Sequence, residues 1–367
     1  MGVGFCGDIR VSRRFEKILE DVTKSGSLVV RKLGADRAAE VGAHRFLGSE
    51  RVTPQAILEE AAERTARACR GRRVVVAQDT TEINFSGCDK GRRGLGLGGD
   101  GASLGFFIHP LVAIDAEDET ALGVVGAKIW TRPLAKLKTH RQKRHLEDKE
   151  SMRWIDAAQT AAQRLAGAAA IVMVGDREND IYQGFTRRPL EIDVAVAGTK
   201  PLLWRLLTTL PVETAEDALE IIRLYRLRWR IEEVFRVLKR DGLALEETQV
   251  ESARSLFNLA ALAVVAAARI IQLTDARDAS ARPATDVIDE SLIEATAAIG
   301  ETLEGKTARQ KNPHPHGSLS WLAWITARLG GWHGYYKPPG PKTMADGWRR
   351  LAAMLDGYVI ADGKSLV

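Results

Sequence analysis

The stretch Arg72-Arg-Val-Val-Val-Ala-Gln-Asp-Thr-Thr-Glu-Ile-Asn-Phe85 marks the point at which the chain changes from a helical to a β-rich pattern. Before it, residues 8 to 70 place apolar side chains three and four positions apart, which predicts a small basic module of helices. After it, apolar runs at 104–116 and 121–132 are set off by glycine-rich or acidic turns. The three runs therefore predict three sequential strands.

The rest of the chain alternates helical and extended patterns, so an α/β fold is expected. We expect, in order, a charged helix at about 148–165, a strand at 168–176, a helix after Asp180, a strand at 190–198, and helices from about Thr214 to Arg240, Ala253 to Leu273 and Trp348 to Tyr358. Residues 275–317 are rich in Asp, Ala, Pro and Lys, which predicts a looser connection.

Composition narrows the class of protein. The chain has 367 residues, 45% of them hydrophobic, which suits a globular protein of two or three structural units. A formal net charge of +5 and a pI near 9.1 favour a polyanionic partner. Cys6, Cys69 and Cys88 lie far apart, without the spacing of a zinc site or a disulfide framework, which indicates a reducing compartment.

No membrane role is expected. The most apolar window, Leu256 to Leu273, contains Asn258 and Arg269, so a buried helix explains it better than a membrane span. The N-terminal residues are too polar for a signal peptide. These features predict a cytoplasmic protein.

The segment Tyr225-Arg-Leu-Arg-Trp-Arg-Ile-Glu-Glu-Val-Phe-Arg-Val-Leu-Lys239 carries the most informative pattern. At about 100° per residue, Tyr225, Arg228, Glu232 and Lys239 fall within about 60° of arc on one helix face. That face presents a carboxylate among cations and a phenol. By itself, such a stripe is as often an ordinary solvated face of paired charges.

Two further carboxylates sit where apolar runs end. Asp79 ends Val-Val-Val-Ala-Gln, and Asp176 ends Ile-Val-Met-Val-Gly, so each is expected where a buried strand emerges at a sheet edge. With Glu232 they would give the oxygen ligands that Mg²⁺ prefers, and two such ions can promote in-line attack on a phosphate. Taken singly, Asp79 and Asp176 are more often turn or helix-cap residues.

Three motifs together resemble the family-four insertion-sequence transposases of the DDE type: Gln78 to Thr81, Gly175 to Glu178, and the Tyr-Arg-Glu-Lys helix. The resemblance spans nearly the whole chain. It includes Gly7 to Asp21, His44 to Leu58, Glu147 to Ser151, Pro201 to Thr209 and Lys337 to Thr343.

The resemblance implies a ribonuclease-H-like catalytic core, a mixed sheet flanked by helices, with Asp79, Asp176 and Glu232 as metal ligands and catalytic residues. Glu233 is then the neighbour turned about 100° away from the shared face. Two Mg²⁺ ions are implied, with Mn²⁺ as a substitute. Tyr225, Arg228 and Lys239 would contact phosphates at the cleaved end.

The same matching gives DNA contacts outside the core. Trp204 would stack on a flipped base, although a Trp in an apolar stretch is usually a core residue. The N-terminal module would bind terminal inverted repeats through four cations that a solvated face explains equally well: Arg10, Arg13, Arg14 and Lys17. Family members form a homodimer in a synaptic complex through the C-terminal region, where the aromatic residues Trp321 to Tyr336 indicate packing or a subunit contact.

One departure affects function. Family members carry a long β-rich insertion between the second Asp and the Glu, whereas here the strand at 190–198 leads almost directly to Pro201-Leu-Leu-Trp204. The main hypothesis is a cut-and-paste transposase that cleaves the element end, forms a hairpin and joins the end to target DNA. The alternatives are an internally deleted derivative that binds DNA or inhibits an intact transposase, and a standalone nuclease.

The expected domains follow from these assignments. They are a DNA-end-binding module at 1–70, a catalytic core with a shortened insertion at 71–274, and a linker with a helical, dimer-forming region at 275–367.

Overall fold

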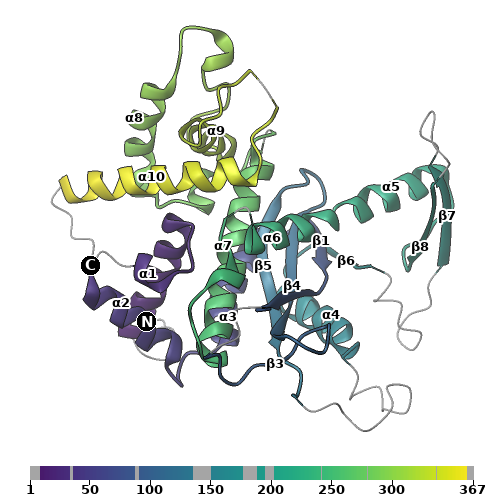
Figure 1. The fold of residues 1–367 in the computed structure, drawn as a ribbon. Coiled ribbons are helices and arrows are strands. Elements are labelled where there is room, and N and C mark those ends of the chain that lie inside the picture. Colours follow the sequence, from purple (N-terminus) through teal and green to yellow (C-terminus); the bar gives the residue numbers. More distant parts are fainter. Residues whose placement is uncertain are drawn as a thin grey trace.

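A mixed β-sheet flanked by helices forms the centre of the protein (Figure 1). The structure, a computed structural model, describes residues 9–33, 36–86, 91–134, 150–176, 188–194, 202–240, 242–278, 280–335 and 337–361. This is the arrangement expected of a ribonuclease-H-like core.

Three helices precede the sheet: α1 (Ile9–Ser25), α2 (Arg37–Gly48) and α3 (Pro54–Ala68). The last two begin at capping side chains, because Asp36 accepts from Ala39 N and Thr53 accepts from Ala56 N. Each of the three contributes buried residues to the same hydrophobic core as the sheet. The predicted helical start of the chain is therefore confirmed, while its boundary as a separate module stays a prediction.

The sheet is built around the long strand β4. Its strands are β1 (Arg73–Gln78), β2 (Thr81–Asn84), β3 (Gly96–Leu97), β4 (Leu104–Asp115), β5 (Ala121–Trp130) and β6 (Ala170–Val174). β1, β2, β3 and β5 pair antiparallel with β4, and β6 pairs parallel with β1. Gln78 lies opposite Leu111 and Thr81 opposite Ile108, so β1 and β2 keep one register and are interrupted only at the two residues between them.

Both faces of the sheet are covered, and alternate residues of β1 point to different layers. Val75 and Ala77 belong to the larger core, with residues of α6 (Trp229–Lys239) and α7 (Ala253–Ala276). Val74 and Val76 pack instead with residues of α4 (Met152–Arg164). The period of two along a strand buried on both sides explains the uninterrupted apolar run.

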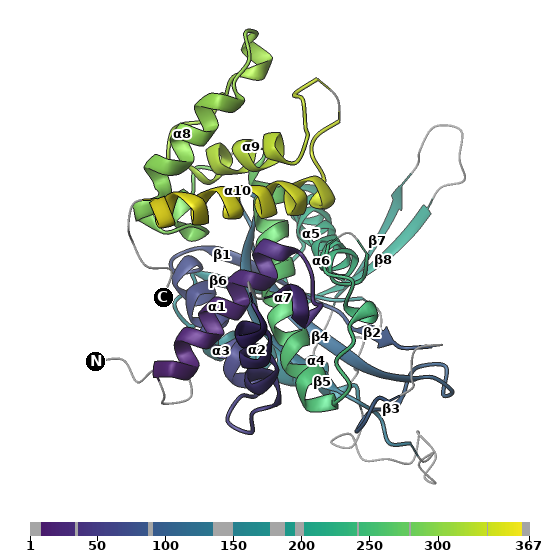
Figure 2. The same cartoon turned by 60° about the vertical axis from the view of Figure 1, so that its left-hand side comes forward.

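The segment between β6 and α6 leaves the body of the protein. Strands β7 (Arg188–Val194) and β8 (Leu202–Thr208) form a two-stranded antiparallel hairpin that projects beside α5 (Ala215–Arg226) in Figures 1 and 2. A capping box between Thr214 and Asp217 starts α5. Short as it is, this hairpin occupies the position of the long insertion expected from the family.

The C-terminal part is helical, with α8 (Ile293–Leu303), α9 (Leu319–Leu329) and α10 (Pro341–Ala361) stacked at one end of the molecule (Figures 1 and 2). Single 3₁₀ turns lie at Val30–Lys32, Leu245–Glu247, Ala284–Asp286, Glu290–Leu292 and Ala308–Gln310. Trp321 and Trp324 are 6% and 4% exposed, so they pack inside the protein.

Helix α7 confirms the buried helix expected from the most apolar window. It is long and apolar enough to cross a membrane, but 83% of that window is buried inside the protein. Its Asn258 is fully buried, and Nδ2 of its side chain donates to the carbonyl oxygens of Leu47 and Val52, at 2.8 and 3.1 Å. A polar side chain in the apolar run therefore ties α7 to the N-terminal helices.

The structure agrees with some of the elements expected from the sequence and corrects others. The second and third predicted strands are present as β4 and β5, whereas the first run forms two strands, β1 and β2, interrupted at Asp79 and Thr80. The strand predicted at 168–176 is present as β6, which ends at Val174. The single helix predicted from about Thr214 to Arg240 is wrong, because it is interrupted at Leu227 and Arg228. The loose connection at 275–317 is also wrong in part, since it contains α8, whose apolar residues pack against α9. The helix predicted after Asp180 begins outside the described residues.

Candidate active site

Asp79 and Asp176 lie at the same edge of the sheet. In the parallel pair of β1 and β6, Ala77 is opposite Val174, and each aspartate follows its strand two residues beyond that pair. Adjacent parallel strands therefore deliver both carboxylates to one place, as expected from the apolar runs that precede them.

The break between α5 and α6 brings a third carboxylate and a cation to this edge. At the break, Arg228 N bonds Tyr225 O and Ile231 N bonds Arg228 O, so hydrogen bonds to the third preceding residue replace the α-helical pattern. One guanidinium nitrogen of Arg228, Nη1, lies 2.8 Å from Oδ2 of Asp79 and 3.5 Å from Oε1 of Glu232. Arg228 thus bridges a carboxylate of β1's end and one of α6.

The electrostatics of Asp79 show that the charges of Asp176 and Glu232 both act on it. Burial, together with the negative charges of Asp176 and Glu232, raises the pKa of Asp79 to about 6. The Thr80 backbone N–H and Arg228 act in the opposite direction. The Asp79 side chain is only 13% exposed and that of Arg228 only 9%, whereas Glu232 is 42% exposed. Asp79 is therefore largely buried, and solvent reaches the site on the side of Glu232.

The donor set fits a hard divalent cation. Carboxylate oxygens from two strand ends and a helix are the ligands that Mg²⁺ accepts while keeping water or phosphate. The pKa of Asp79 is raised first by burial and then by the nearby charges of Asp176 and Glu232, and the charge of a bound dication would favour its ionised form. Within the part of the chain that the structure describes, no three His, Cys, Asp or Glu side chains are close enough together to hold a metal ion. Arg228 provides positive charge between two of the carboxylates instead.

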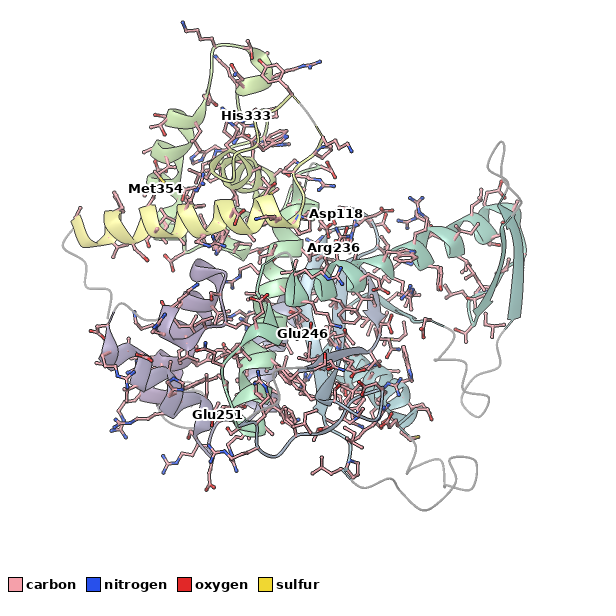
Figure 3. The ribbon with its side chains drawn as sticks, in the orientation of Figure 1. Asp118, Arg236, Glu246, Glu251, His333 and Met354 are labelled. Carbon is pink, nitrogen blue, oxygen red and sulfur yellow. The ribbon has the colours of Figure 1, made fainter. Side chains whose placement is uncertain are left out.

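The other residues of the Tyr-Arg-Glu-Lys helix are more dispersed. Lys239, at the end of α6, lies 4.0 Å from Glu246, which Figure 3 labels on the segment after that helix. Tyr225 is half-buried in α5, before the break. Glu233 has a different partner: its Oε2 lies 3.5 Å from Nη1 of Arg230. Its separation from Glu232 agrees with the helical geometry expected from sequence.

A second polar cluster, not anticipated from the sequence, holds the same strand end from the opposite face. Nδ1 of the buried His109 lies 2.9 Å from the Thr80 hydroxyl, and Nε2 lies 3.2 Å from Oε1 of Gln78. The Nε of Arg153, on α4, donates to the same hydroxyl at 2.8 Å. The signal was available in the sequence, because His109 is a polar residue within a continuous apolar strand.

The remaining predicted DNA contacts lie away from this cluster or along another element. Trp204 belongs to β8 of the projecting hairpin, opposite Ile192 in the pairing with β7. The four predicted cations of the N-terminal module lie on α1: Arg10, Arg13, Arg14 and Lys17. Of these, Arg10, Arg13 and Lys17 are exposed, while Phe15, Ile18, Leu19 and Val22 on the same helix are buried.

A comparison with protein families finds a match to part of the chain. Residues 107–269 match the family model of the transposase DDE domain. The matched segment begins within β4 and includes Asp176 and Glu232, while Asp79 precedes it. It also contains α4, the β7–β8 hairpin and most of α7. This segment of the chain is therefore similar to the transposase DDE domain.

Proposed function

We propose that the protein is a cut-and-paste DNA transposase of the family-four insertion-sequence type, with Asp79, Asp176 and Glu232 as its catalytic carboxylates. The observation that carries this proposal is the meeting of β1, β6 and α6 at one sheet edge, where Arg228 contacts Asp79 and Glu232. The transposase DDE domain supports phosphoryl transfer as the reaction class.

Each residue has a part in that chemistry. Divalent ions held by the three carboxylates would activate water or a 3′ hydroxyl and stabilise the leaving oxygen. Arg228 orients a phosphate beside Asp79, since a guanidinium binds phosphate oxygens in pairs. Lys239, seven residues after Glu232 on α6, extends the cationic face along the DNA backbone. Strand cleavage, hairpin formation and strand transfer are all in-line substitutions at phosphorus.

DNA is the proposed partner outside the site as well. The exposed cations of α1 would contact the phosphates of terminal inverted repeats, while the buried face of the same helix anchors it to the core. The C-terminal helices would hold two copies together in a synaptic complex. Residues 1–70, 71–274 and 275–367 are proposed to divide these tasks.

A second candidate function follows from the β7–β8 hairpin. A two-stranded hairpin is all that the described residues place between β6 and α5. If the family's long insertion is needed to form or hold the DNA hairpin, this protein binds element ends and interferes with intact transposases without completing transposition. The carboxylate site favours the enzyme, and the short hairpin favours the inhibitory derivative.

The test compares two adjacent glutamates of α6. Labelled duplexes carrying the terminal repeats that flank the gene are incubated with Mg²⁺ and the parent protein, Glu232→Gln or Glu233→Gln. We expect site-specific nicking by the parent and by Glu233→Gln, because Glu233 is paired with Arg230. We expect none by Glu232→Gln, which loses a metal ligand.

The products separate the hypotheses. Nicking together with hairpin and strand-transfer products supports the complete transposase. Nicking without hairpin product assigns the lost steps to the shortened insertion. Binding of the repeat without any cleavage refutes the enzyme and supports the inhibitory derivative, whereas equal activity of both variants refutes the assignment of Glu232.

A further inference from the structure

The end of β1 is held from both faces of the sheet. Asp79 continues the series Val75 and Ala77, whose side chains face the α6 side of the sheet, and it contacts Arg228 there. The Thr80 side chain lies on the opposite face of the sheet, where its hydroxyl contacts His109 of β4 and Arg153 of α4. Thr80 is also bonded to Asp79, because its backbone N–H donates to Oδ1 at 2.7 Å. The orientation of the Asp79 carboxylate therefore depends on where Thr80 lies.

The directions of the hydrogen bonds around His109 follow from their partners. Gln78 Oε1 can only accept, so Nε2 of His109 carries a proton. Burial, reinforced by the positive charges of Arg153 and Lys128, lowers the pKa of His109 to about 3, so the ring is neutral and Nδ1 is an acceptor. Arg153 Nε can only donate to the Thr80 oxygen, which leaves the hydroxyl proton for His109 Nδ1.

Packing leaves the imidazole little freedom to turn. His109 is 0% exposed, and its ring meets the indole of Trp154 edge-on at 4.6 Å between centroids. Trp154 is itself 1% exposed, and Arg153, the preceding residue on α4, is 7% exposed. The acceptor for Thr80 is thus fixed by buried groups of β4 and α4.

We propose that His109 is a positioning residue for the carboxylate site, which holds Asp79 in its metal-binding orientation through Thr80. The proposal rests on the proposed function, because it assigns Asp79 as a ligand. His109 fixes the Thr80 hydroxyl, Arg153 anchors the same oxygen, and the Thr80 N–H then holds one oxygen of Asp79. The other oxygen, Oδ2, remains paired with Arg228, whose Nη1 also contacts Glu232.

Two substitutions separate the two nitrogens of His109. The amide of His109→Asn reaches the place of Nδ1 and can still accept from Thr80, but it loses the contact with Gln78. The amide of His109→Gln reaches the place of Nε2 and keeps the contact with Gln78, but it loses Thr80. Thr80→Val removes the hydroxyl from the other side of the same bond. Thr326→Val is the control, because that buried hydroxyl donates to Leu322 O within its own helix.

The experiment measures Mn²⁺ binding to the DNA-free, full-length protein by electron paramagnetic resonance, with Asp79→Asn defining the specific site. We expect His109→Gln and Thr80→Val each to weaken Mn²⁺ binding about 10- to 100-fold, as loss of a group that orients a metal ligand does. His109→Asn should restore most of the affinity. The double variant His109→Gln/Thr80→Val should bind no more weakly than the weaker single variant, because both changes break one link.

Several outcomes would overturn the proposal. They are equal losses in His109→Asn and His109→Gln, additive losses in the double variant, or an unchanged affinity in Thr80→Val. Urea unfolding of every variant, with Thr326→Val as reference, separates a lost orientation from a lost fold. If the parent itself shows no Mn²⁺ site that Asp79→Asn removes, the proposed function fails with it. If the parent has that site but the His109 variants leave it intact, only the present inference fails.

Discussion

Replacing Arg228 by Gln tests whether its guanidinium takes the place of the metal between the carboxylates. Arg228 is 9% exposed and lies 2.8 Å from Asp79, which is 13% exposed. Removing one partner of a buried ion pair leaves the other charge uncompensated and costs about 3–5 kcal/mol. The metal-free variant should lose about that much of its free energy of unfolding, and Asp79 should lose the positive charge that favours its ionised form.

Divalent metal should reverse much of this loss. A ligand that binds only the folded protein stabilises it by RT ln(1 + [L]/Kd), which is about 2.7 kcal/mol at 100 times Kd. Because Arg228→Gln removes a competing positive charge, Mn²⁺ should bind the variant more tightly than the parent and stabilise it by a larger increment. DNA cleavage should nevertheless fall, since the variant lacks the guanidinium that orients phosphate.

The assay is urea unfolding with and without Mn²⁺, together with direct Mn²⁺ titration. Arg282→Gln is the matched control. Arg282 is 4% exposed, and its Nη2 lies 2.7 Å from Oδ2 of Asp286, which is not one of the three carboxylates of the site. The control should lose stability without any change in Mn²⁺ affinity. Weaker or unchanged Mn²⁺ binding by Arg228→Gln would refute the idea that arginine and metal compete for this place.

Three other predictions concern ionisation and burial. Binding of Mn²⁺ to the parent should weaken about tenfold per pH unit below about 6. The reason is that the pKa of Asp79 is raised to about 6 and the metal needs the ionised carboxylate. A constant Mn²⁺ affinity down to pH 5 would contradict this. Burial raises the pKa of Asp275 to about 7, so its contribution to stability is present below its unfolded pKa of 3.8 and is lost as the pH rises through 7. Asp275→Asn should therefore show a shallower decline in the free energy of unfolding between pH 4 and 7, measured by urea unfolding at several pH values. A decline with pH as steep as that of the parent would be evidence against this. Asn258→Leu should cost about 1–3 kcal/mol for each of the carbonyls of Leu47 and Val52 that loses its donor, measured by urea unfolding; an unchanged midpoint would refute the role of this amide.

The sequence predicted much of the core because its patterns are local. Apolar runs that end in Asp79 and Asp176 identify strands, and the structure gives both strands in parallel pairing. The continuous helix predicted from about Thr214 to Arg240 failed at Leu227 and Arg228. Every residue there is compatible with a helix. At the break, hydrogen bonds to the third preceding residue replace the α-helical pattern, and Arg228 pairs with Asp79 at the end of β1. Helical periodicity carries no information about such a contact.

What the sequence by itself determined is the set of chemical groups and the local element that carries each: carboxylates at two strand ends, and a glutamate with cations on one helix face. Only the tertiary structure decided their partners. Arg228 pairs with a residue 149 positions away, and His109 and Arg153 reach Thr80 from different elements. Strand propensity and helix period act over a few residues, whereas these contacts depend on the register of β1 against β4 and on how α4 and α6 pack on opposite faces of the sheet.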